Sequence, residues 1–261
     1  MAAVPGTEDG ADRVPARAGG RLGRPALTWA CLFDLDGVLT DTAGVHTAAW
    51  KEMFGGYLTA RADATGTPFV PFDEVGDYGT YVDGKSRADG TRSFLQSRGI
   101  TLPAGAPSDG AGRLTITGLG EAKNAIFLRT IHRDGVMPYS GSVRYVQAVH
   151  SADLHSAVVS SSANCAEVLT AAGIADLFQT RIDGVSVTEQ HLARKPAPGT
   201  DLASALVLGV EPGGAAVFED ALSGVAAGRA GRFGFVVGVD RVGQPLSVQP
   251  LCLSARVPSR S

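Results

Sequence analysis

The order of apolar and polar positions along the 261-residue chain predicts alternating strands and helices. Short apolar runs are typical of strands that are buried on both faces, and apolar residues three to four positions apart are typical of helices. We expect strands at 27–35, 156–159, 215–218 and 235–239. We expect helices at 42–54, 87–97, 123–131, 142–150, 166–172, 201–208 and 221–230.

The alternation is regular only from residue 142 onward, and this predicts the domain organisation. Strands and helices in steady succession favour an α/β fold with a doubly wound parallel sheet. The first strand is separated from that succession by a long stretch, of which 56–120 is richer in polar residues, Gly and Tyr. We therefore predict a core domain of residues 27–43 and 136–240, with an α-helical cap domain, residues 44–135, inserted between them.

The two ends of the chain differ from the middle. Residues 1–26 are rich in Gly, Ala, Pro, Arg and acidic residues and have few large apolar side chains. We expect them to form a disordered leader. Residues 241–261 contain three prolines and have neither strand nor helix periodicity, so we expect an irregular C-terminal segment.

Composition and charge exclude several classes of partner. The formal net charge is −3, which gives no reason to expect nucleic acid or an anionic membrane surface as a partner. Cys31, Cys165 and Cys252 are scattered without metal-ligand spacing, which favours a reducing, cytoplasmic setting. We find no apolar stretch of membrane-spanning length and no apolar core of a secretory signal at the N-terminus.

Four short polar segments follow predicted strands or precede predicted helices. They are Asp34-Leu35-Asp36-Gly37, Ser160-Ser161-Ser162-Ala163-Asn164, Arg194-Lys195-Pro196-Ala197-Pro198 and Phe218-Glu219-Asp220. Each of them alone is typical of an ordinary turn, cap or connector. Because ligands bind beyond the carboxyl ends of the strands in open α/β sheets, the four together indicate one site at that edge.

The residue types in these segments predict phosphate chemistry with a hard cation. Asp34, Asp36 and Asp220 offer carboxylates to Mg²⁺, which prefers a few carboxylates together with water and phosphate oxygens. Ser160 and the amides after it are placed to hydrogen-bond phosphate oxygens at the start of a helix. Lys195 supplies a positive charge that offsets both phosphate and crowded carboxylates.

With these segments the chain resembles the haloacid dehalogenase superfamily of phosphohydrolases and phosphomutases, and within it the β-phosphoglucomutase family. The resemblance covers roughly residues 30–240. Residues 33–43, followed by His46 and Ala49-Trp50-Lys51, are close to the mutase pattern. Residues 82–89 are similar to the cap substrate loop of that family, and Lys123-Asn124 are similar to a pair on a cap helix.

The resemblance implies a reaction through a phosphorylated aspartate. Asp34 is the expected nucleophile, and Asp36 is the expected general acid and base for the sugar hydroxyl. Mg²⁺ is expected on Asp34, the Asp36 backbone carbonyl and Asp220, with Glu219 supporting that site.

The resemblance also implies a set of substrate-binding residues. Ser160, Ser161, Asn164 and Lys195 are expected around the transferring phosphoryl group. Arg87 is expected to bind the distal phosphate with its bidentate fork. His46, Trp50, Lys51 and Lys123 are expected to orient the sugar and the closed cap, and Thr42 lies at the expected hinge. A packing role stays open for both His46 and Trp50.

We predict a mutase that interconverts β-D-glucose 1-phosphate and glucose 6-phosphate through a bisphosphorylated intermediate. One alternative is a Mg²⁺-dependent sugar-phosphate phosphatase on the same scaffold, which Arg87, His46 and Lys123 disfavour. Another is a non-catalytic remnant, which the presence of Asp34 and Lys195 disfavours. The expected partner is a small sugar phosphate, mutases of other hexose phosphates remain compatible, and we expect a monomer.

The chain departs from the family pattern in three places. Ala163 stands where many mutases have a lysine, and Gly199 replaces the usual aspartate after Lys-Pro-Ala-Pro. Relatives continue after the last matched strand with further sheet and helix, whereas here the chain becomes Pro-rich after Asp240. We therefore predict that the C-terminal segment is aberrant, through truncation or a frameshift.

Overall fold

A computed structural model of the chain describes residues 28–241 and 254–256. Its centre is a six-stranded, fully parallel sheet with the strand order β3-β2-β1-β4-β5-β6. The strands are β1 (Ala30–Phe33), β2 (His155–Val159), β3 (Thr180–Ile182), β4 (Ala215–Glu219), β5 (Phe235–Asp240) and β6 (Ser254–Arg256). Phe33 at the end of β1 is in register with Val158 on one side and Phe218 on the other, so the segments that follow these three strands meet at one edge.

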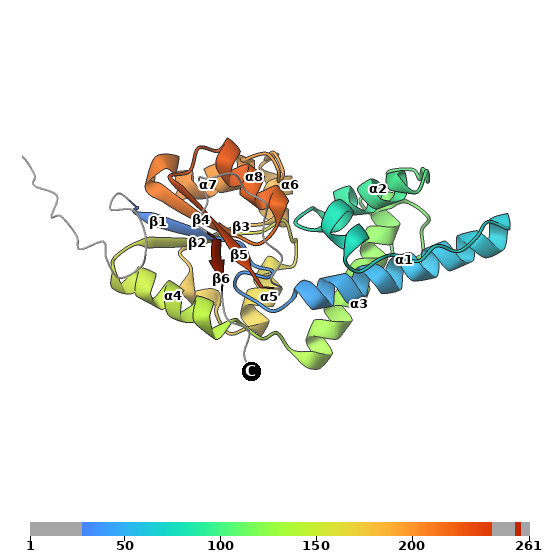
Figure 1. The fold of residues 1–261 in the computed structure, drawn as a ribbon, viewed down its shortest axis with the longest axis horizontal. Coiled ribbons are helices and arrows are strands. Elements are labelled where there is room, and N and C mark those ends of the chain that lie inside the picture. Colours follow the sequence, from blue (N-terminus) through green and yellow to red (C-terminus); the bar gives the residue numbers. More distant parts are fainter. Residues whose placement is uncertain (1–27, 242–253, 257–261) are drawn as a thin grey trace, which may run out of the picture.

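Helices cover both faces of the sheet (Figure 1). The helices α4 (Ser140–Ser151) and α5 (Cys165–Ala171) lie on one face, and α7 (Gly199–Val207) and α8 (Leu222–Ala230) lie on the other. The short helix α6 (Gly184–Glu189) follows β3, and the 3₁₀ turns η2 (Ala175–Leu177) and η3 (Pro212–Gly214) precede β3 and β4.

The side chains of β1 point alternately into the two layers. Cys31 and Phe33 belong to the apolar cluster on the α4 and α5 face, and Ala30 and Leu32 belong to the cluster on the α7 and α8 face. All four side chains are buried. A strand that is covered on both faces has an uninterrupted apolar sequence, which is the pattern that predicted it.

A second group of helices lies apart from the sheet (Figure 1). It consists of α1 (Ala43–Thr65), α2 (Arg87–Ser97) and α3 (Ile116–Asp134), with the π-helical turn η1 (Tyr78–Val82) before α2. This group has its own apolar cluster, in which the Phe54 ring lies 4.1 Å from the Phe94 ring between their centroids. The separate cluster supports our proposal that residues 44–135 are an inserted cap domain.

Two chain connections join this cap to the sheet, and they are hydrogen-bonded to each other. Thr40 and Pro138 form an antiparallel bridge. The Asp41 amide donates to the Met137 carbonyl at 2.9 Å. The two connections therefore form a short two-stranded ribbon.

The prediction of a doubly wound parallel sheet with helices is confirmed, but several boundaries differ. The helix expected at 42–54 continues to Thr65, because Gly55 and Gly56 do not interrupt it; it ends at Gly66, whose φ is +68°. The helix expected at 123–131 begins already at Ile116.

The structure describes none of the proposed leader and only part of the C-terminal segment. The proposed leader, residues 1–26, lies outside the described residues. The segment 241–261 was expected to lack strands, and this is wrong for β6, which pairs in parallel with β5. The rest of that segment after residue 241 also lies outside the described residues.

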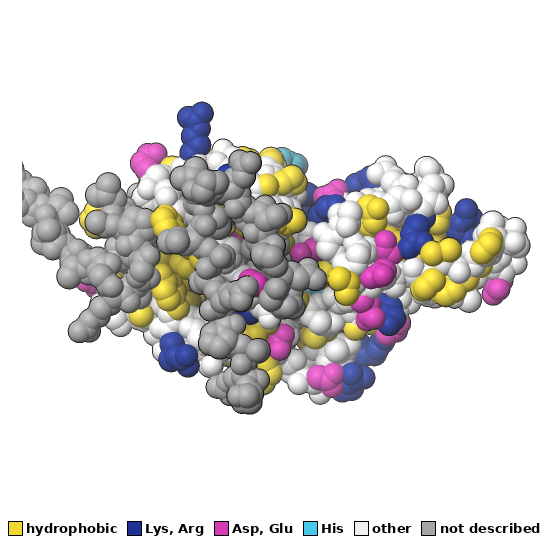
Figure 2. Space-filling model, viewed as in Figure 1, with side chains coloured by type: hydrophobic (Ala, Val, Ile, Leu, Met, Phe, Trp, Pro, Cys, Tyr) yellow, Lys and Arg dark blue, Asp and Glu magenta, His cyan; other side chains and the backbone are white. Residues whose placement is uncertain are grey.

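The surface shows no segregation of charge by sign over the cap. Figure 2 shows basic and acidic side chains interspersed on the visible face of the helical part. Within residues 28–241, where the described helices lie, none is long and apolar enough to cross a membrane.

Candidate active site

The turn after β1 holds the two aspartates that the sequence singles out. The Asp34 amide still bonds to the Phe218 carbonyl of β4 at 2.9 Å, and the chain then turns at Asp36 and Gly37. Gly37 has a φ of +79°, and a Cβ atom added there would lie 1.7 Å from Asp220 Oδ2. Only glycine therefore allows this turn to pack against the loop that follows β4.

A buried lysine joins the carboxylates at this edge of the sheet. Lys195 Nζ donates to Asp34 Oδ1 at 2.7 Å, to the Val159 carbonyl at 3.2 Å and to Glu219 Oε1. The other oxygen of Glu219 accepts from the Ala221 amide at 2.9 Å. The side chains of Lys195 and Glu219 are 2% and 1% exposed, so this ion cluster is largely withdrawn from water.

The electrostatics of the cluster suit a hard divalent cation. Asp34, Glu219 and Asp220 each offer a carboxylate oxygen, and these atoms lie within 4.8 Å of one another. Burial and the charge of Glu219 raise the pKa of both Asp34 and Asp220 well above the usual range. Because crowded carboxylates of this kind are stabilised by an oxygen-preferring cation, the donor set fits Mg²⁺.

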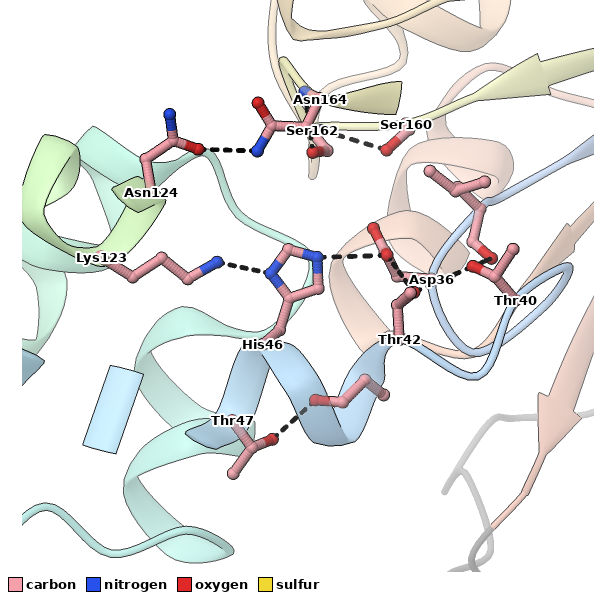
Figure 3. Close-up of polar contacts among 12 residues, drawn as sticks. Asp36, Thr40, Thr42, His46, Thr47, Lys123, Asn124, Ser160, Ser162 and Asn164 are labelled. Carbon is pink, nitrogen blue, oxygen red and sulfur yellow. Dashed lines mark hydrogen bonds and ion pairs between the residues drawn. The ribbon is translucent and has the colours of Figure 1, made fainter. Parts of the chain in front are cut away.

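The second aspartate of the turn faces the cap. Asp36 Oδ1 accepts hydrogen bonds from the Thr42 hydroxyl and from His46 Nε2, the latter at 3.1 Å (Figure 3). Lys123 of α3 in turn contacts His46 Nδ1. The structure therefore contains a continuous polar chain from the core carboxylate to a cap lysine.

This chain fixes the tautomer of His46. The ionised Asp36 carboxylate can only accept, so the ring proton is on Nε2 and points at Asp36, and Nδ1 of the neutral ring accepts from Lys123. Burial and the nearby Lys123 lower the pKa of His46, which favours the neutral ring. The ring also stacks on Phe127 with the centroids 4.2 Å apart. His46 therefore both packs in the cap and makes polar contacts at the site.

Burial and neighbouring groups shift the pKa values of Lys123 and Asp36, the two ends of this polar chain. Burial lowers the pKa of Lys123 to about 7. Burial alone would raise the pKa of Asp36, but His46 and the Thr42 hydroxyl together lower it. Asp36 is therefore held in its ionised form, ready to accept a proton.

Two hydrogen bonds close the cap over the sheet edge. Ser161 Oγ donates to the Gly84 carbonyl at 2.9 Å. Asn164 Nδ2 donates to Asn124 Oδ1 at 2.7 Å, as Figure 3 shows. Ser160 is buried, and its hydroxyl accepts from the Ser162 amide at 3.0 Å. These loops and the cap enclose a cavity between them.

Most of the predicted site residues line this cavity. They are Asp34, Asp36, His46, Trp50, Arg87, Lys123, Ser160, Ser161, Asn164 and Asp220. Trp50 also stacks on Phe54 in the cap core, so it packs and lines the wall at once. Three further predicted residues lie behind the wall, where Thr42 contacts Asp36, and Lys195 and Glu219 contact each other.

Lys51 is the predicted residue that the structure does not bring to the cavity. Its side chain is 56% exposed and pairs with Glu74 at 2.6 Å. Consecutive residues of a helix point in different directions, so the inward position of Trp50 turns Lys51 outward. The expectation of a sugar contact from Lys51 is not supported by this placement.

Two further residues of the cavity wall are Tyr78, to which sequence reasoning gave no role, and Asp83, which it placed only within the cap loop 82–89. The Tyr78 hydroxyl is hydrogen-bonded to Asp83, whose pKa is raised to about 6, chiefly by burial and then by Glu219. Asp83 directly precedes Gly84-Lys85-Ser86-Arg87, and this position next to the predicted phosphate-binding arginine could have marked it as a site residue. Tyr78 lies in the π-helical turn η1, and we find no local sequence pattern that marks it.

Arg87 reaches the cavity from the first turn of α2. Its Nη1 donates to Glu121 Oε1 at 2.8 Å, while the side chain is 27% exposed. The guanidinium is thus anchored on the cap with donors to spare for an anion.

Comparisons with known proteins show the family of the chain. The family model of haloacid dehalogenase-like hydrolases matches residues 30–232. A β-phosphoglucomutase of Mycobacterium bovis is 56% identical over 223 residues, which are 85% of each chain. A β-phosphoglucomutase of Bacillus subtilis is 28% identical over 83% of this chain and 85% of its own.

A solved structure shows the same arrangement. The crystal structure of a β-phosphoglucomutase from Clostridium difficile matches with a TM-score of 0.62 at 26% identity, over 82% of this chain and 85% of that one. The family model and the 56% identical relative each cover most of the chain. The chain belongs to the haloacid dehalogenase-like hydrolase family.

Proposed function

We propose that this protein is a β-phosphoglucomutase, which interconverts β-D-glucose 1-phosphate and glucose 6-phosphate. The observation that carries the proposal is the polar chain Asp36–His46–Lys123, which joins the core to the cap inside the cavity. The Asp36 carboxylate in this chain lines the cavity, which supports a role for it as the proton acceptor for a sugar hydroxyl. The 56% identity to a β-phosphoglucomutase supports the same substrate.

In this reaction the first phosphoryl acceptor would be Asp34. Lys195 bonds to its Oδ1, which leaves Oδ2 to attack phosphorus and form an aspartyl phosphate. The positive charge of Lys195 offsets the charge that develops on the phosphoryl oxygens, and Ser160 and Ser161 line the same part of the cavity.

Transfer back to the sugar would depend on Asp36. The sugar hydroxyl gives its proton to Asp36 as its oxygen attacks the phosphorus, and the bond from phosphorus to Asp34 breaks. The reverse transfer returns that proton to the leaving sugar oxygen. The neutral His46 and the Thr42 hydroxyl orient the Asp36 carboxylate for both directions.

The second phosphate of the bisphosphorylated intermediate would bind at the cap. Arg87 and Lys123 are the cationic side chains of the cap that line the cavity together with Lys85. Lys85 is engaged by the Tyr81 carbonyl at 3.0 Å and by Ser93 Oγ at 3.1 Å, whereas the fork of Arg87 retains free donors. We assign the distal phosphate to Arg87.

We further propose Mg²⁺ as the resident cofactor, held by Asp34 and Asp220 with Glu219 beside them. Bound there, Mg²⁺ would neutralise phosphoryl oxygens and the crowded carboxylates. We also propose that the enzyme acts as a cytoplasmic monomer, with no nucleic-acid or membrane partner.

The test is to incubate the full chain with Mg²⁺, β-D-glucose 1-phosphate and a trace of the bisphosphate, and to follow glucose 6-phosphate and free phosphate together. We expect glucose 6-phosphate without stoichiometric free phosphate. Asp34→Asn should abolish turnover, and Asp134→Asn, at an exposed position, should not change it. Free phosphate alone would overturn the mutase in favour of a phosphatase, and no product from folded protein would overturn both.

A further inference from the structure

One arginine outside the predicted site bonds to the backbone of the catalytic turn. Arg241 follows β5, and its Nε donates to the Gly37 carbonyl at 2.9 Å. Its Nη2 donates to the Val38 carbonyl and to Ser142 Oγ, each at 2.9 Å. One edge of the guanidinium therefore holds two successive carbonyls directly after Asp36.

The same guanidinium is fixed on its other side. It lies over the Tyr139 ring, with Cζ 3.8 Å from the ring centroid. The Tyr139 hydroxyl donates to Asp41 Oδ1 at 2.9 Å, in the ribbon that leads to the cap. Ser142 Oγ also donates to the Val38 carbonyl, at 2.6 Å. Arg241 is thus the common partner of the catalytic turn, the start of α4 and the aromatic ring beside the cap connection.

Within the turn, the Gly37 amide bonds to the Thr40 carbonyl at 2.9 Å and the Leu39 amide bonds to the Leu35 carbonyl at 2.9 Å, while the carbonyls of Gly37 and Val38 are bonded from outside the turn. Gly37 has a positive φ and no side chain, so its peptide groups keep their orientation only through hydrogen bonds and contacts with neighbours. A rotation of these peptides would carry the Asp36 carboxylate away from His46 and Thr42. A planar fork that bonds two neighbouring carbonyls resists that rotation, and a single ammonium group cannot bond both in the same way.

We propose that Arg241 is a positioning residue of the phosphoryl-transfer reaction, acting through the carbonyls of Gly37 and Val38 to hold Asp36 in place. The inference rests on the proposed function, because it concerns the aspartate that serves the sugar hydroxyl there. Arg241 does not line the cavity, so it acts without touching the substrate.

The experiment compares Arg241→Met and Arg241→Lys in the full chain, with Arg133→Met as the matched control at an exposed arginine. Turnover of β-D-glucose 1-phosphate with Mg²⁺ gives kcat and KM, and amide hydrogen exchange is followed by peptide. Because a displacement of about 1 Å costs on the order of 100-fold, we expect kcat of Arg241→Met to fall by about 10- to 100-fold. We expect KM to change less than about three-fold, since the substrate contacts remain.

The exchange measurement separates positioning from general loss of stability. We expect faster exchange in Arg241→Met in the peptide that contains residues 36–40, with the sheet and the cap helices unchanged. Arg241→Lys should retain an intermediate kcat, and Arg133→Met should match the unchanged protein. If Arg241→Met does not fold, Arg241→Lys carries the comparison by the same two readouts.

Three results would overturn the proposal. They are a kcat for Arg241→Met equal to that of Arg133→Met, exchange that rises evenly along the whole chain, and full recovery of kcat by lysine. Each requires that the unchanged protein produces glucose 6-phosphate. If the unchanged protein produces none, the proposed function fails instead, so the two failures are told apart.

Discussion

Replacing Lys195 by methionine should destabilise the protein strongly, because it removes the cation from a buried ion cluster. Lys195 bonds to Asp34 at 2.7 Å and also to Glu219, and the lysine and Glu219 side chains are 2% and 1% exposed. The neighbouring carboxylates raise the pKa of Lys195 against the effect of burial, so it is charged at all ordinary pH values. Breaking a buried pair by removing one partner costs about 3–5 kcal/mol.

That loss should be read from urea unfolding and from thermal unfolding, each followed by circular dichroism in EDTA so that no cation replaces the ammonium. For a protein of this size, about 2–4 °C of Tm is lost per kcal/mol, so Tm should fall by roughly 10 °C. Lys51→Met is the matched control, because Lys51 pairs with Glu74 at an exposed position and such pairs contribute about 0–1 kcal/mol.

The loss should also depend on pH in a defined direction. The pKa of Asp34 is already raised by burial and by Glu219, and without Lys195 protonation of Asp34 relieves the repulsion, so the difference from the unchanged protein should shrink as the pH falls from 8 to 5. Equal losses of stability for Lys195→Met and Lys51→Met would refute the reasoning, as would a difference that grows on acidification.

Three further predictions concern the cap. The pKa of Lys123 is lowered from 10.5 to about 7, so between these pH values the unfolded chain binds a proton at Lys123 that the folded chain does not. The stability of the protein relative to Lys123→Met should therefore rise with pH across that window. A difference in urea unfolding that does not change with pH would contradict this. A Cβ on Gly84 would lie 2.2 Å from Ser223 Oγ at a φ of +65°, so Gly84→Ala should raise KM about ten-fold, from about 1–2 kcal/mol of strain against the closed cap, with an unchanged KM as the contrary result. Asn124→Ala removes the 2.7 Å bond to Asn164, worth about 1 kcal/mol, and steady-state kinetics should show KM about five-fold higher; a rise beyond a hundred-fold would mean that Asn124 binds substrate directly.

The core of the site follows from the sequence because a parallel sheet gathers its strand ends. Asp34, Ser160 and Asp220 are far apart along the chain, yet each follows a strand, and the register of β1 with β2 and β4 brings them to one edge. The buried first strand and the helices α4, α5, α7 and α8 could be predicted because their apolar patterns are strong, whereas the six-residue helix α6 was not predicted.

The parts that could not be predicted depend on contacts without a local pattern. The strand β3 has only three residues, Thr180–Ile182, and is too short for its alternation to be read. Tyr78 lines the cavity from the cap, and Arg241 bonds to the turn that follows β1. Only the folded chain brings these two residues close to the site. Lys51 was predicted as a site residue because it belongs to the motif Ala49-Trp50-Lys51. Neighbouring residues of α1 point in different directions, so Lys51 lies outside the cavity and pairs with Glu74.

The ribbon between cap and core limits how the cavity can open. Two separate connections would let the cap swing, twist and slide over the sheet edge. Because Thr40 pairs with Pro138 and Asp41 with Met137, the two crossings bend together about one line. We therefore expect the cap to rotate as one unit about this ribbon rather than to slide over the sheet edge, so that the cavity residues of cap and core return to the same arrangement each time the cap closes.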